Sequence, residues 1–165
     1  MSLVRLLRLL RLLSLLGFCQ WLEQTSVSVA IRDSAWAFPI IESVHVLGLC
    51  LLGMVILMDL RVLGVALTRL PAEEITADLT PWMTAGVVVM IASGILTFLN
   101  NPVEYYTNTV FRVKMLMLLL LAVNAWALRA GRSQQGRKAA LARTVSLVLW
   151  AGIIVAGRMI TYRML

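Results

Sequence analysis

The sequence predicts an all-α integral membrane protein, a four-helix bundle preceded by an amphipathic helix at the membrane interface. Hydrophobic residues make up 61% of the 165-residue chain and charged residues only 14%, a balance too apolar for a single soluble core. Four apolar stretches each reach the length of about 20 residues that a helix needs to cross a bilayer. The links between them are short, so we expect no separate soluble domain.

Residues 1–35 predict an amphipathic N-terminal segment. In "RLLRLLRLL", arginine recurs every third residue, at Arg5, Arg8 and Arg11. On a helix, the three arginines are therefore spread over one broad face, and leucines occupy the remaining surface. A basic amphipathic helix of this kind lies in the plane of the interface. The alternative is a fifth span over about 12–31, which a carboxylate and an amide in its middle disfavour.

Residues 36–165 contain the four predicted spans. Pro81 is expected to begin the second span, and Asn100-Asn101-Pro102 supplies turn chemistry after it. The link between the third and fourth spans contains glycine and is strongly basic. The predicted spans are 38–60, 81–100, 110–129 and 141–162.

Lysine and arginine counts predict the orientation, because cytoplasmic links carry the excess of positive charge. The links after the first and third spans, with their flanking residues, together hold seven of these residues, whereas the link after the second span, with the residues that flank it, holds only Arg112 and Lys114. We therefore expect links 61–80 and 130–142 on the cytoplasmic side of a bacterial inner membrane. The 101–109 loop and the C-terminus then face outward.

Polar residues from all four spans are expected to meet at one depth near the outer surface. The only histidine, His45, lies three residues after Glu42 at the start of the first span. At about 1.5 Å of rise per residue, these side chains lie roughly 5–12 Å below the outer end of the helix. A carboxylate there needs a partner, and we expect Arg158, whose guanidinium fork matches it. The other residues predicted for this layer are Lys114, Met115, Met159, Tyr162 and, as a structural polar group, Asn100.

Each of these residues also has a plain structural interpretation. Lys114 and Arg158 are long enough to extend to the lipid headgroups. A Glu42–Arg158 pair that only fixes helix packing is the second alternative. A His45 that is only hydrogen-bonded within the bundle is the third.

The charges of the layer suggest a ligand. One carboxylate and two cations leave it net positive, which suits an anionic or metal-bearing molecule. The leading hypothesis is a small non-enzymatic membrane protein with an outer-leaflet polar pocket for a small ligand or metal, acting as an oligomer or complex subunit. The alternatives are a haem-binding electron carrier and a purely structural membrane subunit.

The cofactor is left open by the sequence. Haem b would need His45 together with a methionine or with the histidine of a second copy, and copper would favour the soft methionine ligands. No hydrolase nucleophile–base set, phosphate-binding loop or zinc spacing occurs in the chain. We therefore expect no enzymatic activity.

A second polar layer is predicted near the cytoplasmic ends, formed by Asp59, Arg61 and Asn124. Asp59 and Arg61 do not share a helix face, so each is expected to contact another helix or water, and anchoring is the favoured role. The lipid bilayer is the partner that the sequence predicts. Nucleic acid is not expected, because the net charge of +7 falls in short clusters with no basic face interleaved with aromatic residues.

Several motifs carry a resemblance: "RDSAWAFPIIESVHVLGLCLLG", "MDLRVLG", "PWMTAG", "NTVFRVK" and "GRMITY". Over about Trp21 to Tyr162 the chain resembles an uncharacterised family of bacterial integral membrane proteins. The resemblance implies a small multi-span inner-membrane protein and brings no activity with it. More distantly, a histidine near the start of a span is similar to copper-resistance membrane proteins and b-type membrane cytochromes, although those cytochromes carry several paired histidines.

Overall fold

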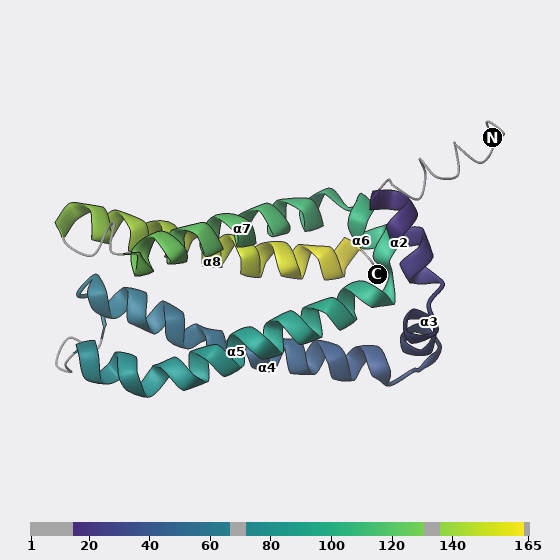
Figure 1. Ribbon diagram of the computed structural model, residues 1–165, viewed down its shortest axis with the longest axis horizontal. Helices are drawn as coiled ribbons and strands as arrows, with labels where there is room; N and C mark the ends of the chain where they lie inside the picture. The colour runs from purple at the N-terminus through teal and green to yellow at the C-terminus, as the bar shows by residue number, and fades with distance from the viewer. Residues whose placement is uncertain (1–14, 67–71, 131–135, 164–165) are drawn as a thin grey trace. The chain divides into compact units, whose positions relative to one another are not determined.

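The computed structural model describes residues 15–66, 72–130 and 136–163. Within these ranges the chain is helical, with no strand. The helices are α2 (Leu15–Glu23), α3 (Ser26–Asp33), α4 (Ala37–Val62), α5 (Ala72–Asn100), α6 (Pro102–Thr107), α7 (Thr109–Arg129) and α8 (Gly136–Arg163) (Figure 1).

Four of these helices are long and apolar enough to cross a membrane, which confirms the predicted fold class. They contain the candidate spans Ala37–Arg61, Ala77–Asn100, Thr109–Leu128 and Arg137–Ile160, close to the predicted ranges. In the span of α7 no residue is buried within the protein, as expected where lipid surrounds a helix. The chain is a multi-pass membrane protein.

The start of α5 differs from the prediction. Pro81 was expected to begin the helix, yet α5 starts nine residues earlier, at Ala72, and continues through the proline. Pro81 has no N–H for the carbonyl of Ala77. Because Ala77 and Pro81 are both exposed at the very end of the span, solvent can hydrate that carbonyl, and the helix tolerates the proline.

The chain forms two compact units. The first unit comprises Met1–Leu47 and Val89–Asn108, and the second comprises Gly48–Val88 and Thr109–Leu165. The helices α4 and α5 each contribute one end to each unit. The two units are described separately below.

In the first unit, the predicted N-terminal helix is interrupted. Residues 1–14 lie outside the described residues, and the rest forms two short helices, α2 and α3, separated at Gln24 and Thr25. The Thr25 hydroxyl accepts a hydrogen bond from the Ser28 backbone amide at 3.4 Å, which caps α3. Within the described residues 15–31, neither short helix is long enough to cross a bilayer, so this part of the chain does not form the alternative fifth span as one continuous helix.

The short helices pack near the C-terminal end of α5 in the first unit. The helix α2 contacts α6, the six-residue helix that follows α5. The fully buried Ser28 of α3 donates a hydrogen bond at 2.5 Å to the carbonyl of Leu99, near the end of α5. A bond to that carbonyl satisfies one of the orphan acceptors of a helix C-terminus.

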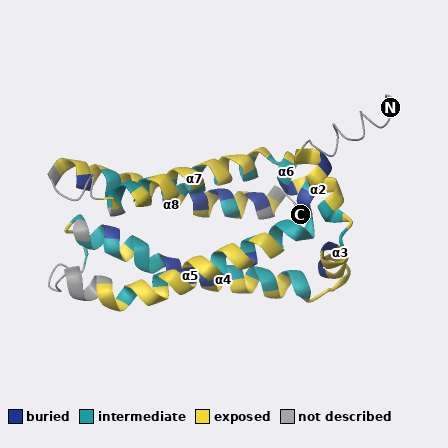
Figure 2. Ribbon diagram, in the orientation of Figure 1, coloured by how far each residue is buried: buried dark blue, intermediate teal, exposed yellow. Residues whose placement is uncertain are grey.

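The second unit contains one end of α4 and one end of α5 together with α7 and α8. The helices α7 and α8 run side by side as an antiparallel pair (Figure 1), and the buried face of α8 is visible in Figure 2. A Cβ placed on Gly86 of α5 would lie only 2.9 Å from the Leu51 Cβ of α4, so these helices approach closely at the glycine. The buried residues of α8 recur at spacings of three, four or seven, which place them on one helix face: Ala139, Ser146, Trp150, Ile153, Ala156 and Ile160.

Candidate functional site

The residues predicted to form one polar layer belong to both units. Glu42, His45 and Asn100 lie in the first unit, and five residues lie in the second: Lys114, Met115, Arg158, Met159 and Tyr162. The expected Glu42–Arg158 pair joins one unit to the other and stays a prediction. Asn100 is the half-buried last residue of α5.

His45 is held by a hydroxyl on the neighbouring span. Its Nδ1 lies 2.8 Å from the Ser93 Oγ of α5, and the same Oγ lies 2.5 Å from the Val89 carbonyl oxygen. A hydroxyl has one proton. Because Ser93 donates it to the carbonyl, Ser93 accepts from His45, so the Nδ1 of His45 carries a proton.

Ser93 was missed in the sequence interpretation. Its buried side chain is followed by Gly94, and a Cβ placed on Gly94 would lie 3.5 Å from the His45 Cε1. The Ser-Gly pair in the middle of an apolar run is the signal that could have identified this contact. A small polar residue facing a span is a common hydrogen-bonding partner between membrane helices.

Glu42 lies within electrostatic reach of a buried phenol. Tyr105 of α6 is 6% exposed, and its ring centroid is 6.2 Å from that of Phe98. Burial raises the pKa of Tyr105 to about 12, with further contributions from the negative charges of Glu104 and Glu42. The phenol therefore stays neutral over the physiological pH range.

In the second unit, Lys114 extends from α7 to α8. Its Nζ lies 3.4 Å from the position that a Cβ on Gly157 would occupy, so the ammonium packs against the backbone of α8. The next residue of α8 is Arg158, whose guanidinium carbon lies 5.1 Å from the centroid of the Tyr162 ring. That geometry is a cation–π contact. Two cations from neighbouring helices thus lie at the same level of the α7–α8 pair.

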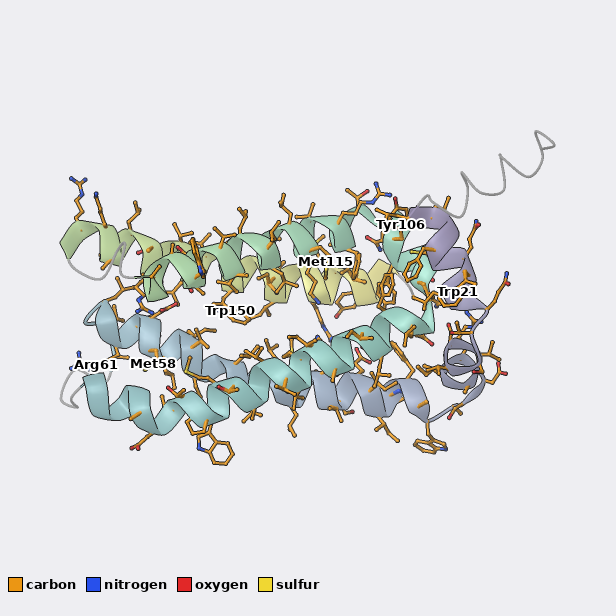
Figure 3. All side chains as sticks on the ribbon, viewed as in Figure 1. Trp21, Met58, Arg61, Tyr106, Met115 and Trp150 are labelled. Carbon is orange, nitrogen blue, oxygen red and sulfur yellow. The ribbon has the colours of Figure 1, made fainter. Side chains whose placement is uncertain are left out.

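The two predicted methionine ligands lie beside these cations in sequence. Met115, labelled in Figure 3, is 42% exposed and Met159 is 49% exposed. Neither thioether is enclosed within the second unit. Across the described ranges there is also no cluster of three or more His, Cys, Asp or Glu side chains able to hold a metal ion.

The α7–α8 pair has an unusual charge composition. Residues 109–165 contain no aspartate or glutamate, whereas nine of them are lysine or arginine. Any carboxylate that neutralises Lys114 or Arg158 must therefore come from outside this stretch. An anionic molecule bound from the membrane is the other source of counter-charge.

The predicted second polar layer contains a buried ion pair. Asp59 of α4 is 1% exposed and its Oδ1 accepts a hydrogen bond from the Arg143 Nη1 of α8 at 2.7 Å. Nearby on α7, the Asn124 Nδ2 donates to the Ala142 carbonyl at 2.9 Å. Arg61, labelled with Met58 in Figure 3, is half-buried in the last turn of α4.

The ion pair is incompletely hydrogen-bonded by the residues described. The Asp59 Oδ2, the Arg143 Nε and the indole nitrogen of Trp150 (Figure 3) are buried and have no hydrogen-bond partner among them. Buried polar atoms of this kind lower the benefit of a charge pair. Arg143 itself was counted only with the charges of the basic link, although it lies two residues inside the predicted fourth span.

Comparison with known proteins identifies the family. A family-wide sequence profile matches residues 18–163. The chain belongs to DUF6644, a family of unknown function. This match confirms the predicted membership of an uncharacterised family over nearly the same range. No curated protein and no solved structure matches the chain, and the distant similarity to copper-resistance proteins and cytochromes finds no support.

Proposed function

We propose that this DUF6644 member is a non-enzymatic membrane protein that binds an anionic amphiphile, such as an acidic phospholipid, at the outer-leaflet end of the α7–α8 pair. Lys114 and Arg158 would contact the anionic group, and Tyr162 would hold the guanidinium in place. The observation that carries the proposal is the Lys114 ammonium packed against Gly157, directly beside Arg158.

The charge balance supports an anionic ligand. A cation inside a membrane span is costly unless it is paired or reaches the interface. Both residues lie on a helix pair without a single acidic residue, and an arginine and a lysine together suit phosphate oxygens. Under the alternative of a purely structural subunit, the two cations only anchor the helix ends.

The proposed location is a bacterial inner membrane, with links 61–80 and 130–142 in the cytoplasm. The excess of lysine and arginine in these links supports this orientation. The Asp59–Arg143 bond joins the end of α4 to the start of α8, which supports the two links lying on the same side of the membrane. We propose that the protein acts as a homo-oligomer or as a subunit of a membrane complex.

The proposal is tested by the thermal stability of the purified protein in detergent with added phosphatidylglycerol or phosphatidylcholine. A ligand that binds only the folded protein raises the unfolding temperature, so we expect the anionic lipid to raise it more. Lys114→Gln and Arg158→Gln should each reduce that difference. Lys138→Gln, which removes an exposed cation at the other end of α8, is the matched control and should preserve it. Equal stabilisation by both lipids would contradict the proposal.

One observation favours the second candidate, a haem-binding electron carrier. His45 donates its Nδ1–H to Ser93, and a metal-bound histidine commonly donates one ring N–H to a protein acceptor in this way. The chain contains a single histidine, so the other axial ligand would be a methionine or a second copy. A Soret band in the absorption spectrum of the purified protein would favour haem. Protein that lacks this band while it binds phosphatidylglycerol would favour the anionic site.

A further inference from the structure

The first unit contains an open apolar groove of about 490 Å³ between α3 and the start of α4. The buried Ile31 of α3 and the Leu96 of α5 form part of its walls. The complete lining is Ser26, Val27, Ala30, Ile31, Ser34, Ala37, Ile41 and Leu96.

The position of the groove places it in the bilayer. Ala37 and Ile41 lie in the first five residues of the α4 span, and Leu96 lies four residues before the end of the α5 span at Asn100. The groove therefore spans the terminal turns of two membrane helices, at the depth where headgroups give way to acyl chains. Trp36, beside the groove in sequence and 75% exposed, is the residue type that concentrates at this level.

The lining offers little to a polar ligand. Only two of the eight residues, Ser26 and Ser34, carry polar side chains, and the Ser34 hydroxyl already accepts a hydrogen bond from the Ala37 amide at 3.2 Å. The nearest cation on α3, Arg32, is paired with Glu23 at 3.5 Å and donates to its carbonyl. A polar molecule in the groove would therefore lose its hydrogen bonds to water without replacement.

We infer that the groove seats one acyl chain of a bilayer lipid. The medium at this depth consists of acyl chains, and one chain laid along the groove covers apolar surface that no described part of the protein covers. Since Arg32 is paired with Glu23, we expect the groove to bind the acyl chain of a lipid regardless of the charge of its headgroup. This inference is independent of the proposed anionic site, which lies in the second unit and depends on charge.

The test uses the full-length protein reconstituted with phosphatidylcholine that carries a photoreactive diazirine on one acyl chain. Peptide mass spectrometry then locates the cross-links. We expect labelling to concentrate on Ile41 and Leu96 relative to Ile40 and Ile95, which are 58% and 57% exposed and lie outside the groove. Phosphatidylglycerol with the same chain should give the same pattern.

Ala30→Trp fills the groove and should abolish most of the labelling at Ile41. Val29→Trp introduces the same side chain on α3 outside the groove and should leave the labelling unchanged. Ala37→Phe serves as a second filling variant in case the first does not fold. The inference would be overturned by equal labelling of residues inside and outside the groove. It would also be overturned if all three substitutions changed the labelling of Ile41 equally.

Two other occupants give distinct results. If the segment 1–14 occupies the groove, its deletion should increase the labelling of Ile41. If a second copy occupies it, labelling should increase when the protein is diluted in lipid. Either increase would also overturn the inference.

Discussion

The buried Asp59–Arg143 pair allows the strongest quantitative prediction. Removing one partner of a buried ion pair typically costs about 3–5 kcal/mol, because the other charge is left without compensation. We expect Arg143→Met to reach this range, since the Asp59 side chain is 1% exposed. Asp59→Asn retains an oxygen that can still accept from Arg143, so we expect a smaller loss of about 1–3 kcal/mol.

The double substitution Asp59→Leu/Arg143→Met should lower the free energy of unfolding much less than the two single substitutions added together. The Oδ2 of the aspartate and the Nε of the arginine have no partner among the described residues, so the native pair is incompletely compensated. Replacing such a pair with apolar side chains is often neutral or stabilising. We therefore expect the double variant to be at least as stable as the native protein.

The assay is reversible unfolding in mixed micelles. The free energy of unfolding is measured for the native protein, for Asp59→Leu, for Arg143→Met and for the double variant. Arg137→Met, which removes an exposed cation from the first turn of the same helix, is the control and should change the free energy of unfolding by less than about 0.5 kcal/mol. If the two single effects simply add within about 0.5 kcal/mol, the residues do not interact and the reasoning is refuted.

Three further predictions concern other parts of the molecule. Gly86→Val should lower the free energy of unfolding by about 1–3 kcal/mol through overpacking against α4, whereas an unchanged value in micelle unfolding would contradict the close approach. Because Tyr105 has its pKa raised to about 12 from an ordinary value near 10, its neutral form contributes stability in full below pH 10 that is lost as the pH rises toward 12. Tyr105→Phe should remove that part of the pH dependence, and an identical alkaline profile would show that the phenol plays no part. Cysteines placed by Gln134→Cys and Asn108→Cys should label oppositely with an impermeant reagent, and labelling of the first in intact cells would reverse the proposed orientation.

The spans could be predicted from the sequence because their physics is local. Length and apolar content suffice to recognise a membrane helix, and all four were found within a few residues of their structural bounds. The start of α5 could not be placed, because Pro81 is a strong helix-breaking signal in water-soluble proteins. It is tolerated here at the exposed end of the span.

The partners of the polar residues could not be predicted, because they depend on how helices pack. The need of Asp59 for a counter-charge was evident from the cost of a carboxylate in lipid. That Arg143 supplies it depends on how α8 packs against α4, which the sequence does not show. In the same way, the sequence does not show whether the Ser93 hydroxyl bonds only to the backbone of its own helix or also to another helix. The packing of α4 against α5 brings it to His45.

The most direct test of the proposed function is native mass spectrometry of the protein released from nanodiscs that contain equal amounts of phosphatidylglycerol and phosphatidylcholine. The native protein and the Lys138→Gln control should both retain phosphatidylglycerol in preference to phosphatidylcholine. The double variant Lys114→Gln/Arg158→Gln should retain the two lipids equally. A double variant that keeps the full preference for phosphatidylglycerol would show that Lys114 and Arg158 do not form an anionic site.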